Sequence, residues 1–138
     1  MSQAFDEVAE AFELLDDWED RYRYLIDLGR KETGLAEAEK TPARRVEGCV
    51  SQVWLVAERR DDGALVLRGD SDAHIVKGLV AVLLRLFNGR RPEEILALDA
   101  RQALGRLDLQ GHLTPSRTNG LFAMVGRVRQ MANAALAG

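Results

Sequence analysis

Cysteine is the scarcest informative residue in the sequence: Cys49 is the only one among 138 residues. This excludes a disulfide within the chain, a Cys-x-x-Cys redox pair, a zinc ribbon and a metal cluster held by several thiolates of one chain. A chain of this length buries roughly two-thirds of its unfolded surface, so it needs no disulfide for stability. Disulfides are rare in the reducing cytoplasm, and we therefore expect a cytoplasmic protein.

Further absences narrow the function. The two histidines, His74 and His112, do not stand at the short spacings of a zinc site, and no phosphate-binding glycine loop is present. The longest apolar run, Leu79–Leu84, is far shorter than the ~20 residues that cross a bilayer, so we expect no membrane span. The net charge of −3 argues against nucleic-acid binding.

Charge is distributed unevenly along the chain. Residues 1–45 carry twelve acidic and seven basic side chains, whereas residues 100–138 carry five arginines and one aspartate. Solvated helix faces are the ordinary explanation, because such asymmetry bears on association and solubility rather than on fold.

The first part of the chain predicts two helices. Apolar residues recur at helical spacing over residues 5–15 and again over residues 18–26. The Asp16-Asp17 pair is suited to cap the second helix, and Gly29 is suited to end it. Residues 30–42 show no period and predict a loop.

The middle of the chain predicts a small antiparallel sheet. Residues 51–58 are rich in β-branched and aromatic side chains and apolar on both faces, which is typical of a strand covered on both sides. A turn signal at residues 61–63 leads to a returning strand at residues 64–68. A short strand at residues 44–47 is expected to complete a three-stranded sheet.

The remainder predicts helices. The aspartates within residues 70–72 offer a capped start to a helix that Gly89 ends, a short helix follows Pro92, and the last helix starts at Pro115. Strands segregated from helices indicate an α+β fold. We expect residues 1–138 to form one domain, in which the small sheet packs against N-terminal and C-terminal helices.

Cys49 is the strongest candidate for chemistry. A lone cysteine is usually a small buried apolar residue, but here Gly48 permits a tight turn, and Ser51 and Gln52 supply polar neighbours. Arginines at residues 44–45 would favour the thiolate if they fold back onto it. A thiol without a second cysteine can still take a group from another protein and hand it on.

A few charged residues have both an ordinary and a functional interpretation. Arg117, in the first turn of the last helix, forms an internal ion pair or serves as a docking arginine near the thiol. Asp70 and Asp72 cap a helix or contact a partner. His74 and His112 are helix-end histidines in the ordinary interpretation.

Four segments together resemble the SufE proteins, which are sulfur acceptors for cysteine desulfurases. In chain order they are Gly48-Cys49-Val50-Ser51-Gln52-Val53-Trp54, Gly69-Asp70-Ser71-Asp72-Ala73 with Ile75-Val76-Lys77-Gly78-Leu79, Arg91-Pro92-Glu93-Glu94-Ile95-Leu96, and His112-Leu113-Thr114-Pro115-Ser116-Arg117 with Asn119-Gly120-Leu121. The N-terminal helices fit as well, so the resemblance covers nearly the whole chain. Val50 and Arg91 depart from it, since glutamine and threonine are commoner there, but Cys49 is retained.

The resemblance implies a SufE/IscU-like fold and a transpersulfidation partner rather than a self-sufficient enzyme. A SufS/CsdA-type cysteine desulfurase, with its own pyridoxal phosphate, would pass persulfide sulfur to Cys49 and be stimulated in return. The sulfur would then pass to a scaffold for iron–sulfur cluster assembly. The cysteine loop would shelter the thiol until docking. Residues implied in partner binding or loop support are Arg117, Asp72, Ser51, Gln52, Gly48 and His112.

The chain itself is expected to carry no metal or cofactor and to be a monomer or a weak homodimer. Three alternatives stay open. A docking regulator would change desulfurase turnover while Cys49 is only structural. A scaffold would assemble clusters directly, although one cysteine makes a poor cluster site, and a one-cysteine peroxidase would act without a partner.

Overall fold

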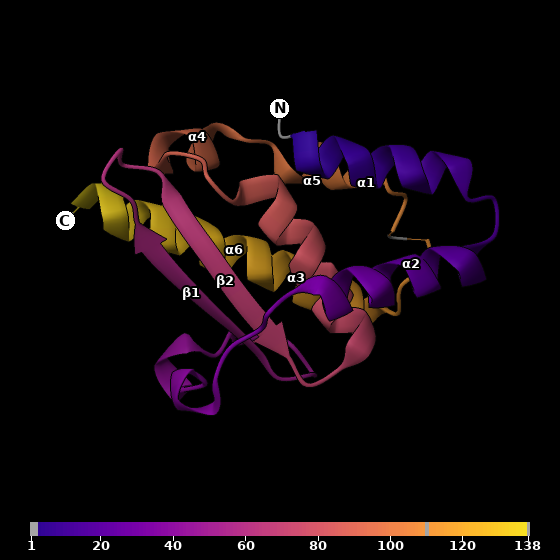
Figure 1. The fold of residues 1–138 in the computed structure, drawn as a ribbon, viewed down its shortest axis with the longest axis horizontal. Helices are drawn as coiled ribbons and strands as arrows, with labels where there is room; N and C mark the ends of the chain where they lie inside the picture. Colours follow the sequence, from indigo (N-terminus) through magenta and orange to yellow (C-terminus); the bar gives the residue numbers. More distant parts are fainter. Residues whose placement is uncertain (1–2, 110, 138) are drawn as a thin grey trace.

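The computed structural model describes residues 3–109 and 111–137. Its elements are α1 (Gln3–Leu14), α2 (Trp18–Lys31), two short 3-10 helices η1 (Glu37–Glu39) and η2 (Pro42–Arg44), β1 (Val53–Arg59), β2 (Leu65–Ser71), α3 (His74–Phe87), α4 (Pro92–Ala97), α5 (Ala100–Gly105) and α6 (Pro115–Ala137) (Figure 1). Within the described ranges, no helix is long and apolar enough to cross a membrane.

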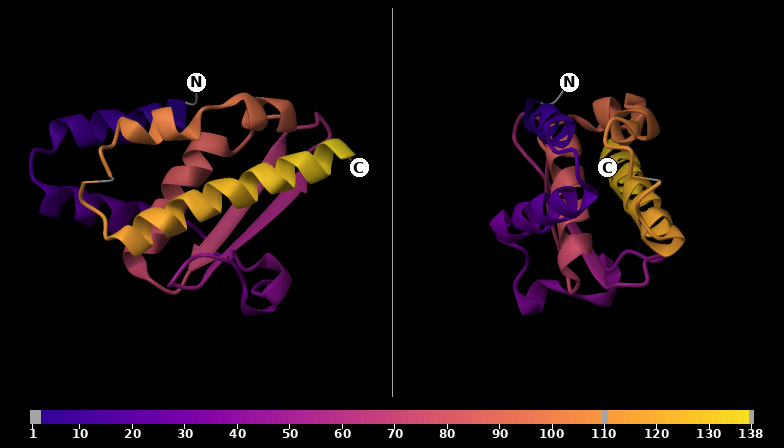
Figure 2. Two further views of the ribbon diagram at one scale, coloured as in Figure 1. Left: turned by 180° about the vertical axis from the view of Figure 1, so that it is seen from behind. Right: turned by 90° about the vertical axis from the view of Figure 1, so that its right-hand side faces the viewer.

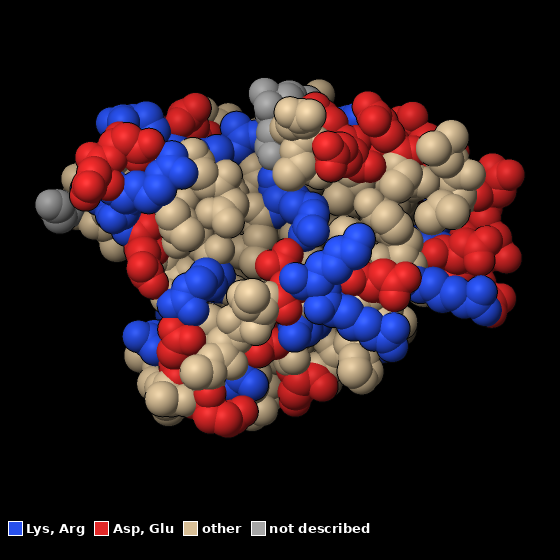
Figure 3. Space-filling view, in the orientation of Figure 1, with Lys and Arg blue, Asp and Glu red and all other residues tan. Residues whose placement is uncertain are grey.

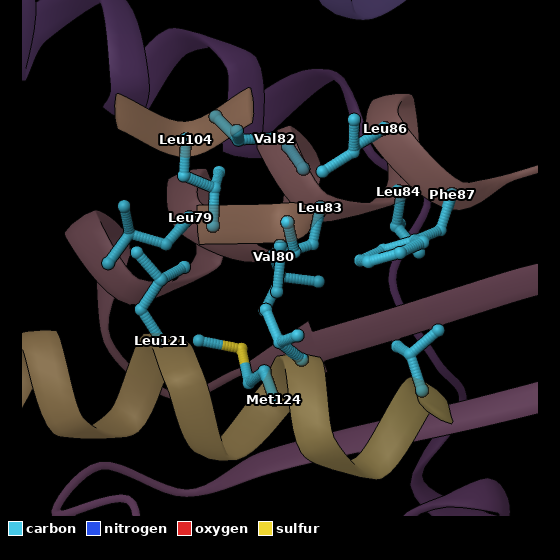
Figure 4. Close-up of a cluster of buried hydrophobic side chains, with 14 of the residues drawn as sticks. Leu79, Val80, Val82, Leu83, Leu84, Leu86, Phe87, Leu104, Leu121 and Met124 are labelled. Atoms are coloured by element: carbon cyan, nitrogen blue, oxygen red, sulfur yellow. The ribbon is translucent and has the colours of Figure 1, made fainter. Parts of the chain in front are cut away.

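Helix α3 forms the centre of the core. It contacts α1, α2, α6 and β2, and most of its residues are buried, while Lys77 and Arg85 lie on its one polar side. Figure 4 shows its side chains meeting Leu121 and Met124 of α6. Asn88 caps its end and Gly89 follows with a φ of +80°, so the predicted end of this helix is confirmed.

Two glycines allow α2 and α3 to cross closely. A β-carbon on Gly78 would lie 2.2 Å from the carbonyl oxygen of Leu25, and one on Gly29 would lie 2.8 Å from the nitrogen of Gly78. The prediction that Gly29 ends α2 is therefore wrong, because the helix continues to Lys31 and Gly29 serves the crossing. Asp17 caps the start of α2 as predicted, accepting a hydrogen bond from the Glu19 N–H.

The sheet has two strands in the described residues rather than three. β1 and β2 pair antiparallel from Val53↔Ser71 to Arg59↔Leu65, around the predicted turn. The predicted strand at residues 44–47 is reduced to one isolated bridge, Arg45↔Trp54. Residues 42–44 form a 3-10 turn and Gly48 has a φ of +91°, so too little extended chain remains between them to pair.

Both faces of the sheet are covered, as predicted. Val53 and Leu55 face the main core, while Trp54 and Val56 pack with Leu35 in a second apolar cluster on the other face. The segment that follows α2 therefore folds over the outer face of the sheet. It carries η1 and η2 and leads to Cys49.

Helix α6 covers the opposite side of the sheet and crosses the hairpin diagonally, in front of it in the rear view of Figure 2. Helix α6 starts at Pro115 as predicted, and α5 is a fourth helix after the sheet, at a position for which the sequence analysis names no helix. Acidic side chains gather over α1 and its connection to α2 (Figure 3). The acidic and basic ends of the chain meet at an Arg106–Asp6 ion pair of 2.8 Å.

Asp70 lies near the end of β2 and does not cap α3, whose N-cap is Ala73 without a side-chain hydrogen bond. Its buried carboxylate accepts hydrogen bonds from the N–H groups of Leu35 and Ser71. Burial by itself would raise the pKa of Asp70, but these bonds and the charges of Lys77 and Lys40 outweigh it and hold the pKa below its ordinary value. Asp70 thus joins the segment after α2 to the end of β2.

Candidate functional site

Cys49 lies in a loop between the Arg45 bridge and the start of β1, against the first turns of α6. Its thiol donates a hydrogen bond to the carbonyl oxygen of Gly120 at 3.5 Å. The side chain is half-buried. The loop therefore holds the sulfur against α6 rather than in open solvent.

Two glycines make this approach possible. A β-carbon on Gly120 would lie 3.4 Å from the sulfur of Cys49, and one on Gly48 would lie 3.2 Å from Cβ of Ala123. Gly48 also has a φ of +91°, a conformation that side chains disfavour. The tight turn predicted at Gly48 is therefore present, and it brings the thiol onto α6.

A small cavity of about 20 Å³ adjoins the sulfur. Its walls include the apolar side chains of Val76, Leu79 and Met124, together with Ser116 and Arg117 from the start of α6. One water-sized probe fills ~10–15 Å³, so the space accepts about one further heavy atom beside the thiol.

The resting thiol is not activated. Burial raises the pKa of the Cys49 thiol above its ordinary value, and the positive charge of Arg45 offsets only part of this effect. Arg44 lies upstream as well, but its guanidinium donates to the carbonyl oxygen of Glu39. The protonated thiol therefore dominates at neutral pH.

We expect Cys49 in the folded protein to react slowly with iodoacetamide at pH 7.5. Because the thiolate is the reacting form, and burial both raises the pKa of the thiol and limits access to the sulfur, unfolding in denaturant should speed alkylation severalfold. Time courses read by intact mass would measure this. Equal rates in the folded and unfolded protein would contradict the sheltered thiol.

The far end of the loop is tied to the start of α3. The carbonyl oxygen of Gln52 accepts bonds from the Ser71 hydroxyl at 2.8 Å and the Asp72 N–H at 3.2 Å, and the Gln52 N–H donates to the Asp72 carboxylate at 3.0 Å. Of the predicted site residues, Asp72 and Gln52 are thus joined directly, through backbone atoms of Gln52. Ser51 also lines the cavity beside Cys49.

Arg117 and Val50 lie at the exposed side of the site. Arg117 lines the cavity of Cys49, and among the described residues its side chain has neither an ion-pair nor a hydrogen-bond partner. The predicted internal ion pair is therefore wrong, because this first turn of α6 points into solvent. Val50 is 82% exposed, a large value for an apolar side chain beside a half-buried cysteine.

His112 lies apart from the thiol. Its ring stacks on Trp18 with centroids 4.0 Å apart, and its carbonyl oxygen accepts a hydrogen bond from the Tyr22 hydroxyl. It fixes the connection before α6 to α2. His74 follows the Ala73 N-cap as the first residue of α3.

Comparison with known proteins agrees with this architecture. The family model described as "SufE: Fe-S metabolism associated domain" matches residues 6–132. The chain belongs to the SufE family. The family description places its members in iron–sulfur metabolism, and the resemblance seen in the sequence is thereby confirmed.

Two curated SufE-like relatives are similar over nearly their whole length. The "Uncharacterized SufE-like protein" of Rhizobium meliloti (strain 1021) is 43% identical over 136 residues, 96% of this chain and 97% of the relative. That of Rhizobium etli is 46% identical over 132 residues, 94% of this chain and 89% of the relative. A hypothetical protein from Thermus thermophilus, solved in solution, shares the fold with a TM-score of 0.79 at 23% identity, covering 100% of this chain and 99% of the other.

Sequence reasoning missed several contacts that place Cys49 in the structure. Gly120 belongs to a segment that carries the family resemblance, but its contact with Cys49 had only one local signal, a glycine near the start of a helix, where glycine costs stability. The contacts of Ser71 and Arg127 have no local signal, because their partners are backbone carbonyls distant in sequence.

Proposed function

We propose that this SufE-family protein accepts persulfide sulfur on Cys49 from a pyridoxal-phosphate cysteine desulfurase, stimulates that enzyme, and passes the sulfur on for iron–sulfur cluster assembly. The observation that carries the proposal is the placement of Cys49. Its thiol lies in a loop next to an exposed arginine, with room for about one further atom.

The transfer needs no oxidant. The Cys49 thiolate attacks the outer sulfur of the desulfurase persulfide, a new S–S bond forms to Cys49, and the old S–S bond breaks with its electron pair left on the desulfurase cysteine. Because the thiol is protonated in the resting loop, it must lose its proton on docking. Arg117 and Asp72 are proposed to contact the desulfurase, and the exposed Val50 marks the side from which it approaches.

The decisive experiment is an intact-mass measurement after incubation with a cysteine desulfurase and free cysteine, without reductant. We expect a species heavier by one sulfur atom, sensitive to reductant and absent from Cys49→Ser. An unchanged wild-type mass under conditions in which the desulfurase turns over would overturn the proposal.

The half-buried, hydrogen-bonded thiol also favours a second candidate, a docking regulator in which Cys49 is structural. The regulator predicts equal stimulation of the desulfurase by wild type and Cys49→Ser. The carrier predicts that Cys49→Ser loses the stimulation of alanine formation from free cysteine. Measuring desulfurase turnover together with the intact mass distinguishes the carrier from the regulator.

A further inference from the structure

The segment before Cys49 lies along α6 in register. Cys49 contacts Gly120, Gly48 lies against Ala123, and the backbone near residues 43–45 meets Arg127. These three positions of α6 are spaced by three and four residues, so they share one helix face about 10 Å long. The segment therefore runs antiparallel to α6, and Arg127 holds its outer end.

Arg127 binds this segment by its backbone. One guanidinium nitrogen donates to the carbonyl oxygen of Arg45 at 3.1 Å, and the other donates to the carbonyl oxygen of Ala43. The planar guanidinium presents its donors in a fixed fork, which suits two carbonyls that point the same way. A single side chain thus fixes two alternate peptide groups.

Little packing supports the same stretch. A hollow of about 380 Å³ lies between the 42–47 segment and α6, with Arg45, Glu47 and Gln130 among the side chains around it. Val46 buries its side chain and donates its N–H to the Val53 carbonyl oxygen at 2.8 Å, which makes it the inner anchor. The hydrogen bonds of Arg127 bridge the hollow and supply the outer anchor.

We infer that Arg127 is a positioning residue for Cys49, which fixes the 43–48 segment along α6 so that Gly48 and the thiol seat against Ala123 and Gly120. This inference rests on the proposed function, because exposure of the Cys49 thiol matters only if that thiol accepts sulfur. The contacts of Arg127 would set how often the loop opens and exposes the thiol. Arg127 acts through the backbone of the segment and not on the sulfur itself.

The test is the rate of Cys49 alkylation by iodoacetamide in the isolated full-length protein. Arg127→Ala should raise the rate about three- to tenfold, because losing two charge-assisted bonds to carbonyls raises the population of the open loop. Arg127→Lys, which keeps the charge but lacks the fork, should fall between Arg127→Ala and wild type.

Arg129→Ala is the matched control. Arg129 lies on the same helix and donates to the carbonyl oxygen of Leu96 at 3.1 Å. Its replacement therefore also removes a guanidinium and a hydrogen bond to the backbone, but at a place away from Cys49. Its alkylation rate should equal that of wild type. Hydrogen exchange should likewise quicken at Val46 to Cys49 in Arg127→Ala and not in Arg129→Ala.

Each outcome bears on the inference separately from the proposed function. A wild-type alkylation rate in Arg127→Ala, or an equal increase in Arg129→Ala, overturns the positioning role even if Cys49 still accepts sulfur. If Arg127→Ala melts below the assay temperature, the comparison of Arg127→Lys with wild type decides, and equal rates overturn the inference. If wild-type Cys49 accepts no sulfur while Arg127→Ala is alkylated faster than wild type, the result counts against the proposed function alone.

Discussion

Gly78→Ala is expected to lose about 3 kcal/mol of unfolding free energy and about 10 °C in Tm, although alanine is the better helix former. The added β-carbon would lie 2.2 Å from the carbonyl oxygen and 2.6 Å from the carbonyl carbon of Leu25. Both are backbone atoms of α2, so the contact is relieved only if the two helices separate. Separation would expose the core faces of α2 and α3 to water.

Gly126→Ala provides the control for this substitution. It makes the same chemical change inside α6, where a β-carbon would meet nothing within 4 Å, so it should stabilise the protein by about 0.5–1 kcal/mol. Denaturant unfolding followed by circular dichroism measures both. Equal stability of Gly78→Ala and wild type would mean that the α2–α3 crossing is not as close as described.

Asp70→Asn is expected to cost about 2–3 kcal/mol at pH 7, because a buried carboxylate that accepts from two N–H groups becomes an amide with one acceptor oxygen. Lys40 and Lys77, at 3.6 and 3.4 Å from the carboxylate oxygens, would also lose their shared counter-charge. The consequence extends to the site, because Asp70 precedes the two residues that hold Gln52.

The pH dependence of this loss has a defined sign. The pKa of Asp70 is lowered in the folded state, so its contribution is fully present above the unfolded value of about 3.9 and is lost as the pH falls through the folded value. The stability gap between wild type and Asp70→Asn should therefore be constant from pH 7 to pH 5 and shrink below about pH 4.

Asp99→Asn is the matched control for the charge change. Asp99 caps α5 by accepting from the Gln102 N–H at 3.1 Å, and asparagine caps helices about as well as aspartate. Its unfolding free energy should stay close to wild type at each pH. A gap for Asp70→Asn that is absent at pH 7, or that widens on acidification, would contradict the role given to Asp70.

Elements whose signals are local were predictable. The hairpin follows from a turn signal between apolar strands, and α6 follows from Pro115 and a long helical period. The turn at Gly48 and the family were also predictable, because each depends on residue type and order. The docking residues, the desulfurase partner and the sulfur-carrier role stay predictions.

Local signals gave wrong predictions where contacts with residues distant in sequence determine a residue's role. Gly29 fits a helix end equally well, and only Gly78 across the crossing makes it a packing glycine. Asp70 fits a helix cap, but in the structure its buried carboxylate accepts a hydrogen bond from the Leu35 N–H on another segment. Residues 44–47 fit a strand, but the turn at Gly48 leaves a single bridge.

The sequence by itself determined the α+β order of elements, the single cysteine Cys49 and membership of the SufE family, because composition, periodicity and motif order are properties of the chain alone. Only the tertiary structure decided the state of that thiol. Its burial against Gly120 outweighs the charge of Arg45 and raises the pKa of the thiol, and Arg127 holds the segment that places it there. These effects arise between residues some 70 to 80 positions apart, where no local pattern can record them.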